Sequence, residues 1–405
     1  MNDDGRPAPD AAEVRRRALA RTDGGDGDGD ADAVDGDGDV DAVDGTDDGA
    51  GGTADGGADG DGEPDHEDEG LTYAAAGVDV AASEAATAAL VSEVGGGAGD
   101  YAGLLDIGDR YLGLTTDGVG TKLLVAEALG DYSTVGIDCI AMNANDLVAA
   151  GVRPVAFVDY LAVEAPDETT AAQVGDGLAR GADLAGVELV GGETAVLPEV
   201  VSGLDLAGTC AGLAAKDAVF DGTAEPGDAI VGWQSSGIHS NGLTLARKAA
   251  TRRHDYDDPC PFEGYETVGA ALLEPTRIYA DLLDPMIEHG VRAAAHVTGG
   301  GWRNLTRMGA HRYVIDEPFD PQPVFEFVAE EGGVDDEEMH RTFNMGTGFV
   351  AALPAADAVD LARETHGRVI GSVRPAGGEG SAEADADADV DADDGGVVEI
   401  RGHRL

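Results

Sequence analysis

The chain has 405 residues, and its 80 acidic side chains against 25 basic ones give a formal net charge of -55 at pH 7. This charge excludes a nucleic-acid partner, which a basic patch would have to bind, and it predicts adaptation to concentrated salt, where the Debye length falls to about 3 Å at 1 M. The N-terminus lacks the apolar core of a signal peptide, no apolar run reaches membrane-span length, and the three cysteines show no metal-binding spacing. We therefore expect a cytoplasmic protein without a membrane partner.

Acidic low-complexity sequence flanks the part of the chain that can fold. Residues 22–70 are dominated by Asp, Gly and Ala, which cannot bury a core, so a disordered tail is expected over residues 1–70. The Asp-Gly repeats do not match a calcium-binding EF-hand loop. In a loop that starts at Asp35, Val40 and Thr46 stand where an EF-hand needs Gly and Glu. The rest is expected to divide into an N-terminal domain 71–216, a C-terminal domain 217–375, an acidic insert 376–396 and a terminal strand 397–405.

Apolar patterns predict strands that alternate with helices. Strands are expected at residues 111–115, 155–163, 188–190, 206–214, 229–233 and 348–353. Helices are expected at residues 170–185, 241–253, 276–289 and 355–366, with Asn241 as the N-cap of the second. This alternation predicts an α/β or α+β fold rather than a helical bundle.

Five polar, glycine-containing motifs stand where apolar runs end, and together they favour an enzyme that handles phosphate. The first is TTDGVGTKL, in which Asp117 suits Mg²⁺ and Thr121 and Lys122 suit a phosphate beside the backbone of Gly118 and Gly120. The spacing is not that of a P-loop. The alternative is an ordinary turn after a strand with an exposed Asp.

The second motif, MNANDLVAAG, brings amides and a carboxylate to the expected start of a helix. Asn143, Asn145 and Asp146 either cap this helix or, with Asp146 holding Mg²⁺, attract phosphate to its N-terminus. The third motif, VGGET, is expected to end a buried strand. Its Glu193 is either a ligand-site carboxylate or a surface turn residue.

The fourth motif, SSGIHSNG, lies between an expected strand and an expected helix, a usual place for a bound phosphate. Its candidate substrate residues are Ser235, Ser236, Gly237, His239, Ser240 and Asn241. His239 is expected to donate to a phosphate or to move a proton. The alternative is a capping box with a surface histidine.

The fifth motif, HVTGGGWRN, contains three consecutive glycines, Gly299, Gly300 and Gly301, which predict a close approach of backbone to a ligand. His296 at its start is either part of this site or a satisfied core histidine. A further turn, NMGTG, adds the amide of Asn344 as a candidate substrate contact.

These motifs, in this order, resemble the aminoimidazole ribonucleotide (AIR) synthetase family, the phosphoribosylformylglycinamidine cyclo-ligases. The resemblance rests on TTDGVGTKL, GIDCIAMNANDLVAAGVRPVAFVDY, LVGGETAVLPEV, SSGIHSNGLTLARK, LLEPTRIY, AHVTGGGWRN and RTFNMGTGFVAALP. It implies a homodimer whose N-terminal domains share a β-barrel-like core, with C-terminal α/β domains beside it. The implied reaction is the ATP- and Mg²⁺-dependent cyclisation of formylglycinamidine ribonucleotide to AIR in purine synthesis.

The resemblance also implies a role for each candidate residue. ATP and Mg²⁺ are assigned to Asp117, Gly118, Gly120, Thr121, Lys122, Asn145, Asp146 and Glu193, with Asp117 and Asp146 as the metal ligands. The substrate is assigned to Ser235, Ser236, Gly237, His239, Ser240, Asn241, Gly299, Gly300, Gly301 and Asn344. His239, Asp117 and Lys122 are the expected catalytic residues.

Two departures from the family pattern leave contacts open. Ala74 and Ala75 stand where the family often has a Lys-Asp pair, and Val196 stands at a position that is acidic in the family. The alternative functions are another ATP-dependent enzyme of the same superfamily, such as thiamine-phosphate kinase, and a non-enzymatic acidic protein that buffers metal ions.

Overall fold

The computed structural model describes residues 70–78, 82, 85–87, 89–90, 101–376 and 396–405. The expectations for the acidic tail and for nearly all of the acidic insert lie outside these residues. The described residues all belong to one compact unit, Asp65–Leu405. The expected domain boundary at 216/217 falls between the two sheets of this unit and stays a prediction.

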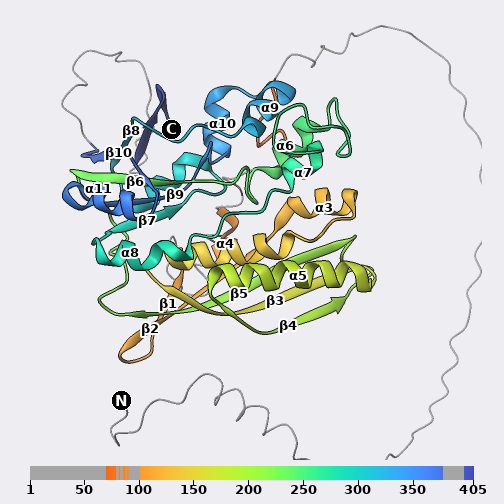
Figure 1. Ribbon diagram of the computed structural model, residues 1–405, viewed down its shortest axis with the longest axis horizontal. Helices are drawn as coiled ribbons and strands as arrows, with labels where there is room; N and C mark the ends of the chain where they lie inside the picture. The colour runs from red at the N-terminus through yellow and green to blue at the C-terminus, as the bar shows by residue number, and fades with distance from the viewer. Residues whose placement is uncertain (1–69, 79–81, 83–84, 88, 91–100, 377–395) are drawn as a thin grey trace, which may run out of the picture. The chain divides into compact units, whose positions relative to one another are not determined.

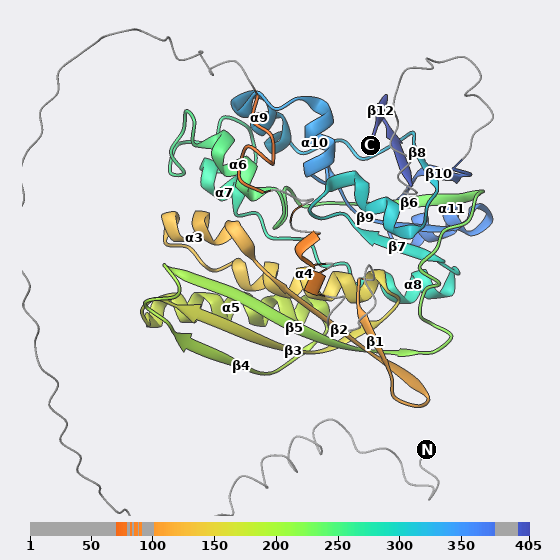
Figure 2. The same ribbon diagram turned by 180° about the vertical axis from the view of Figure 1, so that it is seen from behind.

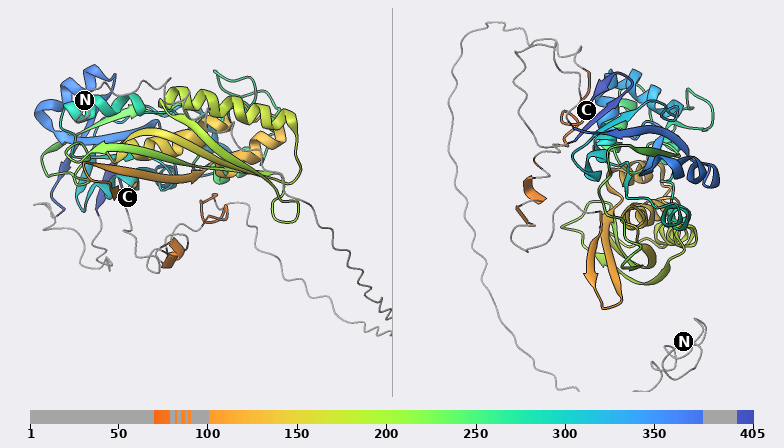
Figure 3. Two further views of the ribbon diagram at one scale, coloured as in Figure 1. Left: turned by 90° about the horizontal axis from the view of Figure 1, so that it is seen from below. Right: turned by 90° about the vertical axis from the view of Figure 1, so that its left-hand side faces the viewer.

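The first sheet, sheet A, has five strands in the order β1-β2-β5-β3-β4. Its neighbours are antiparallel except β3 and β4, which are parallel and are joined through helix α5. The strands are β1 (Gly103–Asp106), β2 (Arg110–Gly118), β3 (Arg153–Val163), β4 (Glu188–Val196) and β5 (Leu204–Ala215). Figure 3 shows these strands in two further views.

Two helices, α4 (Val135–Ala149) and α5 (Glu168–Ala185), cover one face of sheet A (Figure 1). They pack closely because glycines line their contact: a Cβ on Gly136 would lie only 2.2 Å from the backbone N of Leu178. Helix α4 also contacts β7 of the second sheet, and every residue of α4 except Asp146 is buried. A helix buried all round is apolar all round, so any polar residue in it needs a specific partner.

The second sheet, sheet B, has seven strands in the order β12-β11-β8-β10-β6-β9-β7. All its neighbours are antiparallel except β8 and β11. The strands are β6 (Asp228–Gln234), β7 (Ala293–His296), β8 (Arg312–Ile315), β9 (Thr347–Pro354), β10 (Arg368–Arg374), β11 (Val397–Ile400) and β12 (His403–Arg404).

Shorter helices connect and cover these strands, and α4 lies between sheet A and sheet B (Figure 2). The α-helices are α3 (Leu123–Leu129), α6 (Leu243–Ala250), α7 (Val268–Leu272), α8 (Leu283–Glu288), α9 (Pro323–Gly332), α10 (Asp336–Thr342) and α11 (Ala355–Glu364). The 3₁₀ helices are η2 (Gly120–Lys122), η3 (Ala280–Leu282) and η4 (Gly301–Met308). Among the described helices, none combines the length and hydropathy needed to cross a membrane.

The mixed α/β fold class is confirmed, and each expected strand of the body lies within an observed one. Three element predictions are wrong in detail. Helix α6 begins at Leu243 with Gly242, at φ 79°, in the N-cap position, rather than at Asn241. Residues 276–279 are not helical, and the expected terminal strand is two strands, β11 and β12.

Both interpretations of the second motif placed it at the start of a helix, and that position is wrong. Helix α4 begins at Val135, so Asn143, Asn145 and Asp146 lie in its later turns and cap nothing. The run before this motif, residues 135–141, is largely apolar, and such a run fits a strand as well as a helix. The sequence therefore did not indicate that the helix begins at Val135. The VGGET motif likewise does not end a buried strand, because the exposed strand β4 runs through it to Val196.

Candidate active site

The carboxylate of Asp138 lies at the point where three separate motifs meet. Its Oδ1 accepts hydrogen bonds from Lys122 Nζ (2.9 Å), Ser240 Oγ (3.1 Å), Thr276 N–H (2.8 Å) and Thr276 Oγ1 (2.6 Å). Lys122, Asp138, Ser240 and Thr276 are all buried. This cluster joins the motif after β2, helix α4 and the 235–242 loop through one buried charge.

Lys122 is fully buried, and its ammonium also donates to the backbone carbonyl of Glu274 at 2.5 Å. A buried ion pair needs further hydrogen bonds to both charged groups, and Lys122 Nζ and Asp138 Oδ1 each take part in such bonds. The expected contact of Lys122 with a phosphate stays a prediction, since its Nζ points to Asp138. Its neighbour Thr121 reaches helix α6, with its Oγ1 3.0 Å from Thr244 Oγ1.

Sequence reasoning missed Asp138 and Thr276. The signal for Asp138 was a lone carboxylate in the apolar run VGIDCIAM, which requires a buried partner. Thr276 gave no signal, because only the fold brings it to α4.

A second polar chain runs from Asp146 through His296 to Asn145. Asp146 Oδ1 lies 3.0 Å from His296 Nδ1, and His296 Nε2 lies 3.3 Å from Asn145 Nδ2. Asn145 also accepts from Tyr279 N–H (2.8 Å) and donates to Arg277 C=O (2.9 Å). With its Nε2 accepting from an amide, His296 donates from Nδ1 to Asp146, which orients that carboxylate.

Asp117 lies at the end of β2, close enough to Asp146 for the two charges to interact. Loss of hydration raises the pKa of Asp117, the charge of Asp146 raises it further, and a 2.7 Å hydrogen bond from Gly118 N–H opposes both effects. Asn143 donates to the Asp117 carbonyl at 3.2 Å. These two interacting carboxylates form an oxygen donor set suited to a divalent cation.

His239 is buried, so the surface-histidine alternative is wrong. It adopts a positive φ of 68°, and its Nε2 accepts from Ser236 N–H at 3.1 Å. Burial lowers its pKa well below the ordinary value, so the ring is neutral. Because Nε2 accepts, the ring proton is on Nδ1, which has no hydrogen-bond partner within the described part of the chain.

Two amide side chains, those of Asn344 and Gln322, donate hydrogen bonds to backbone carbonyls of the 235–242 loop. Asn344 Nδ2 donates to the carbonyls of Gly237 (2.9 Å) and Ile238 (3.2 Å). Gln322 Nε2 donates to Ser235 C=O at 2.6 Å, a contact that sequence reasoning missed. The structure therefore gives Asn344 bonds to the loop backbone, and its expected substrate contact stays a prediction.

The three glycines of the fifth motif abut the same loop. A Cβ on Gly299 would lie 3.1 Å from Asn241 Oδ1, so the two motifs touch. Gly301, at φ 53°, leaves no room for a side chain, because a Cβ there would lie 2.3 Å from His340 C=O. Asn304 fixes the turn by accepting from Thr298 N–H at 2.7 Å.

Glu193 is not brought to the other motifs within the chain. It is exposed on β4, opposite Tyr160 of β3, on the face of sheet A away from α4. The turn interpretation of Glu193 is wrong, since β4 continues past it.

Comparisons with known proteins match both halves of the chain to one family. Residues 99–214 match the family model of the AIR synthase related protein, N-terminal domain, and residues 225–382 match that of its C-terminal domain. A phosphoribosylformylglycinamidine cyclo-ligase from Methanosarcina barkeri is 47% identical over 319 residues, which are 76% of this chain and 96% of the relative.

Two solved structures share the fold at low sequence identity. Thiamine monophosphate kinase from Aquifex aeolicus is 17% identical with a TM-score of 0.53, over 72% of this chain and 94% of that one. A hydrogenase maturation protein HypE, in complex with ATP, is 20% identical with a TM-score of 0.52, over 75% of this chain and 86% of that one.

The fold and the convergent motifs define a two-part α/β protein of the AIR synthase-related class. Within that class, the chain belongs to the phosphoribosylformylglycinamidine cyclo-ligase (AIR synthetase) family.

Proposed function

We propose that the protein catalyses the ATP-dependent ring closure of formylglycinamidine ribonucleotide to AIR, with release of ADP and phosphate, in purine biosynthesis. The γ-phosphoryl group of ATP is transferred to the formyl oxygen, and ADP leaves. The amidine-side nitrogen then attacks the formyl carbon, and phosphate departs with that oxygen. The observation that carries this proposal is 47% identity over 96% of a curated cyclo-ligase.

Asp117 and Asp146 would hold Mg²⁺ beside the phosphates of ATP. Their fit is supported by their oxygen donors and by the raised pKa of Asp117, which loss of hydration raises first and the nearby charge of Asp146 raises further. Bound Mg²⁺ neutralises charge on the phosphates during transfer. His296 orients the Asp146 carboxylate by donating to it from Nδ1.

The 235–242 loop and the glycines 299–301 would bind the substrate. His239 presents an unpartnered Nδ1–H inside the loop and suits donation to an anion, while its lowered pKa opposes a positive charge on the ring. The buried pair of Lys122 and Asp138 holds this loop through Ser240. We assign Lys122 a positioning role, in addition to the phosphate contact expected from the family.

The outer face of sheet A supports a homodimer. Leu105, Leu114, Val158 and Tyr160 lie on that face, and each is exposed by 39% or more in the single chain. A contiguous apolar face of this kind usually marks an interface. Glu193, opposite Tyr160, would then face the partner copy, which explains its separation from the other motifs.

The large negative charge supports function in concentrated salt, where self-repulsion is screened. The reaction is tested by incubating the protein with formylglycinamidine ribonucleotide, ATP and Mg²⁺ in molar KCl. Stoichiometric AIR and ADP are expected, and omission of Mg²⁺ should abolish both. Phosphorylation of thiamine phosphate without AIR formation would instead establish the kinase alternative.

A further inference from the structure

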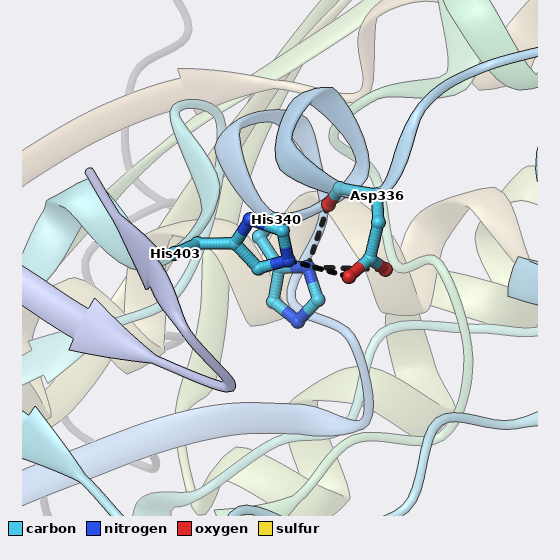
Figure 4. A group of neighbouring side chains, drawn as sticks. All are labelled: Asp336, His340 and His403. Atoms are coloured by element: carbon cyan, nitrogen blue, oxygen red, sulfur yellow. Dashed lines mark hydrogen bonds and ion pairs between the residues drawn. The ribbon is translucent and has the colours of Figure 1, made fainter.

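Three side chains of metal-ligand type meet at a place remote from the motifs above. Asp336 and His340 come from helix α10, and His403 comes from strand β12 of the C-terminal hairpin (Figure 4). One ligand atom of each residue lies within 4.8 Å of the others. Sequence reasoning gave no sign of this cluster, because 67 positions separate Asp336 from His403.

The carboxylate of Asp336 lies beside both imidazoles (Figure 4). His403 Nε2 lies 2.6 Å from Asp336 Oδ2, and His340 Nδ1 lies 3.6 Å from Asp336 Oδ1. The two rings are 5.3 Å apart between centroids and tilted by 31°. Asp336 and His340 are one helical turn apart and so share one face of α10, the spacing that lets a helix offer two ligands to one ion.

A backbone carbonyl fixes which nitrogen of His340 carries its proton in the metal-free protein. A carbonyl oxygen only accepts, so His340 Nδ1, 2.7 Å from the Asp336 carbonyl, is the donor. A metal bound at Nδ1 would replace this hydrogen bond, and one bound at Nε2 would keep it. Arg401 lies 3.9 Å from the Asp320 carboxylate, which offsets part of its repulsion toward a cation.

The geometry points to a three-ligand site for a borderline transition-metal ion, with Zn²⁺ as the representative, that clasps the C-terminal hairpin to α10. Two imidazoles with one carboxylate prefer such an ion to Mg²⁺, and a fourth position would take water. Tetrahedral ligands at about 2.0–2.1 Å from zinc lie about 3.3 Å apart, so His403 Nε2 and Asp336 Oδ2, which are 2.6 Å apart, would have to separate by less than about 1 Å. His403 is partly exposed, which leaves room for that movement.

The site would act on stability rather than on the reaction. An ion bound only by the folded chain stabilises it, and this one would join residues distant in sequence. The competing interpretation is a metal-free clasp, in which Asp336 simply accepts hydrogen bonds from protonated His403. Metal titration of the full chain separates the two.

The test adds Zn²⁺ to the metal-free full-length protein in molar KCl, which suppresses weak binding to the acidic surface. We expect one tightly bound Zn²⁺ per chain, a rise in Tm of several degrees, and visible absorption of a low-symmetry site when Co²⁺ replaces Zn²⁺. His403→Gln removes a partly exposed ligand and should abolish all three effects. The matched control is His289→Gln, which alters another partly exposed histidine beside a carboxylate, Glu364.

Asp336→Asn is a second ligand variant, and it leaves the His340 ring in the interior. It should weaken Zn²⁺ binding by at least about tenfold, in line with loss of one ligand. Absence of stoichiometric Zn²⁺ on the wild-type protein would overturn the proposal. Equal Zn²⁺ binding and an equal Tm rise in wild type and His403→Gln would overturn it as well.

Discussion

Lys122 Nζ and Asp138 Oδ1 form an ion pair of 2.9 Å in which neither side chain is exposed to solvent. The pair joins the motif after β2 to the core helix α4, and Asp138 extends the connection to the 235–242 loop. The pair therefore fixes how the motif after β2 meets the 235–242 loop.

Replacing Asp138 with Asn should lower the free energy of unfolding by about 3–5 kcal/mol, because it leaves the Lys122 ammonium buried without a counter-charge. Denaturant unfolding in high salt measures this loss. Asp360→Asn, which breaks the exposed pair with Arg363, is the matched control and should change little. Equal losses in the two variants would contradict the role given to Asp138.

Asp117→Asn and Asp146→Asn should each lower turnover by at least about 10²-fold, because each removes a hard oxygen ligand beside the transferring phosphate. The measurement is steady-state AIR formation at several Mg²⁺ concentrations. Asp106→Asn, which alters an exposed carboxylate paired with Lys216, should keep the wild-type rate. Near-normal rates in both site variants would rule out the proposed metal ligands.

His239→Gln should mainly raise KM, with a smaller effect on turnover, because an amide can still donate where the Nδ1–H of the neutral ring does. The lowered pKa of His239 means that it contributes no limb to the rate profile near neutral pH. Steady-state kinetics of both proteins across the pH range provide the measurement. If turnover instead fell by about a hundredfold or more, with loss of one limb of the pH profile, His239 would be an acid–base group.

Stability should fall as the pH drops below about 6.5, the ordinary pKa of histidine. His239 has a lowered pKa in the folded state, so the unfolded chain binds its proton first and is favoured by acid, at up to about 1.4 kcal/mol per pH unit. His340, also lowered, acts with the same sign. Unfolding of His239→Gln between pH 5 and 8 should show a smaller slope than wild type; an unchanged slope would show that His239 titrates normally.

Val158→Asp should convert the proposed dimer into a monomer, because it puts a charge into the apolar outer face of sheet A. Light scattering after size exclusion in molar KCl measures the mass. The control is Val359→Asp, at a comparably exposed valine of helix α11 on the other side of the fold. A wild-type mass of one chain, or a dimer that persists in Val158→Asp, would contradict the assigned interface.

The sequence alone indicated the fold class, the family and the strands β2 to β6 and β9, whereas β1, β7, β8 and β10 were not predicted. Short-range geometry governs strands with alternating burial, such as β5, and the glycine-containing turns around Gly300 and Gly346. Such features can therefore be predicted from the local sequence alone. The motif residues stood out in the sequence because polar residues next to glycine are unusual after apolar strands, and their assigned roles stay predictions.

Tertiary structure alone decided which of those residues meet and what each one touches. In the sequence, Asn143 and Asn145 were candidate helix caps, yet they lie in the later turns of α4. Both are buried because α4 packs against sheet A on one side and β7 on the other. The alternative that placed His239 at the surface is wrong because the side chain is buried, and Asp336 and His403 meet because β11 pairs with β8 and brings β12 to α10. Such contacts join segments that are far apart in the chain. Which segments meet depends on how whole helices and strands pack together, and a local sequence pattern does not contain that information.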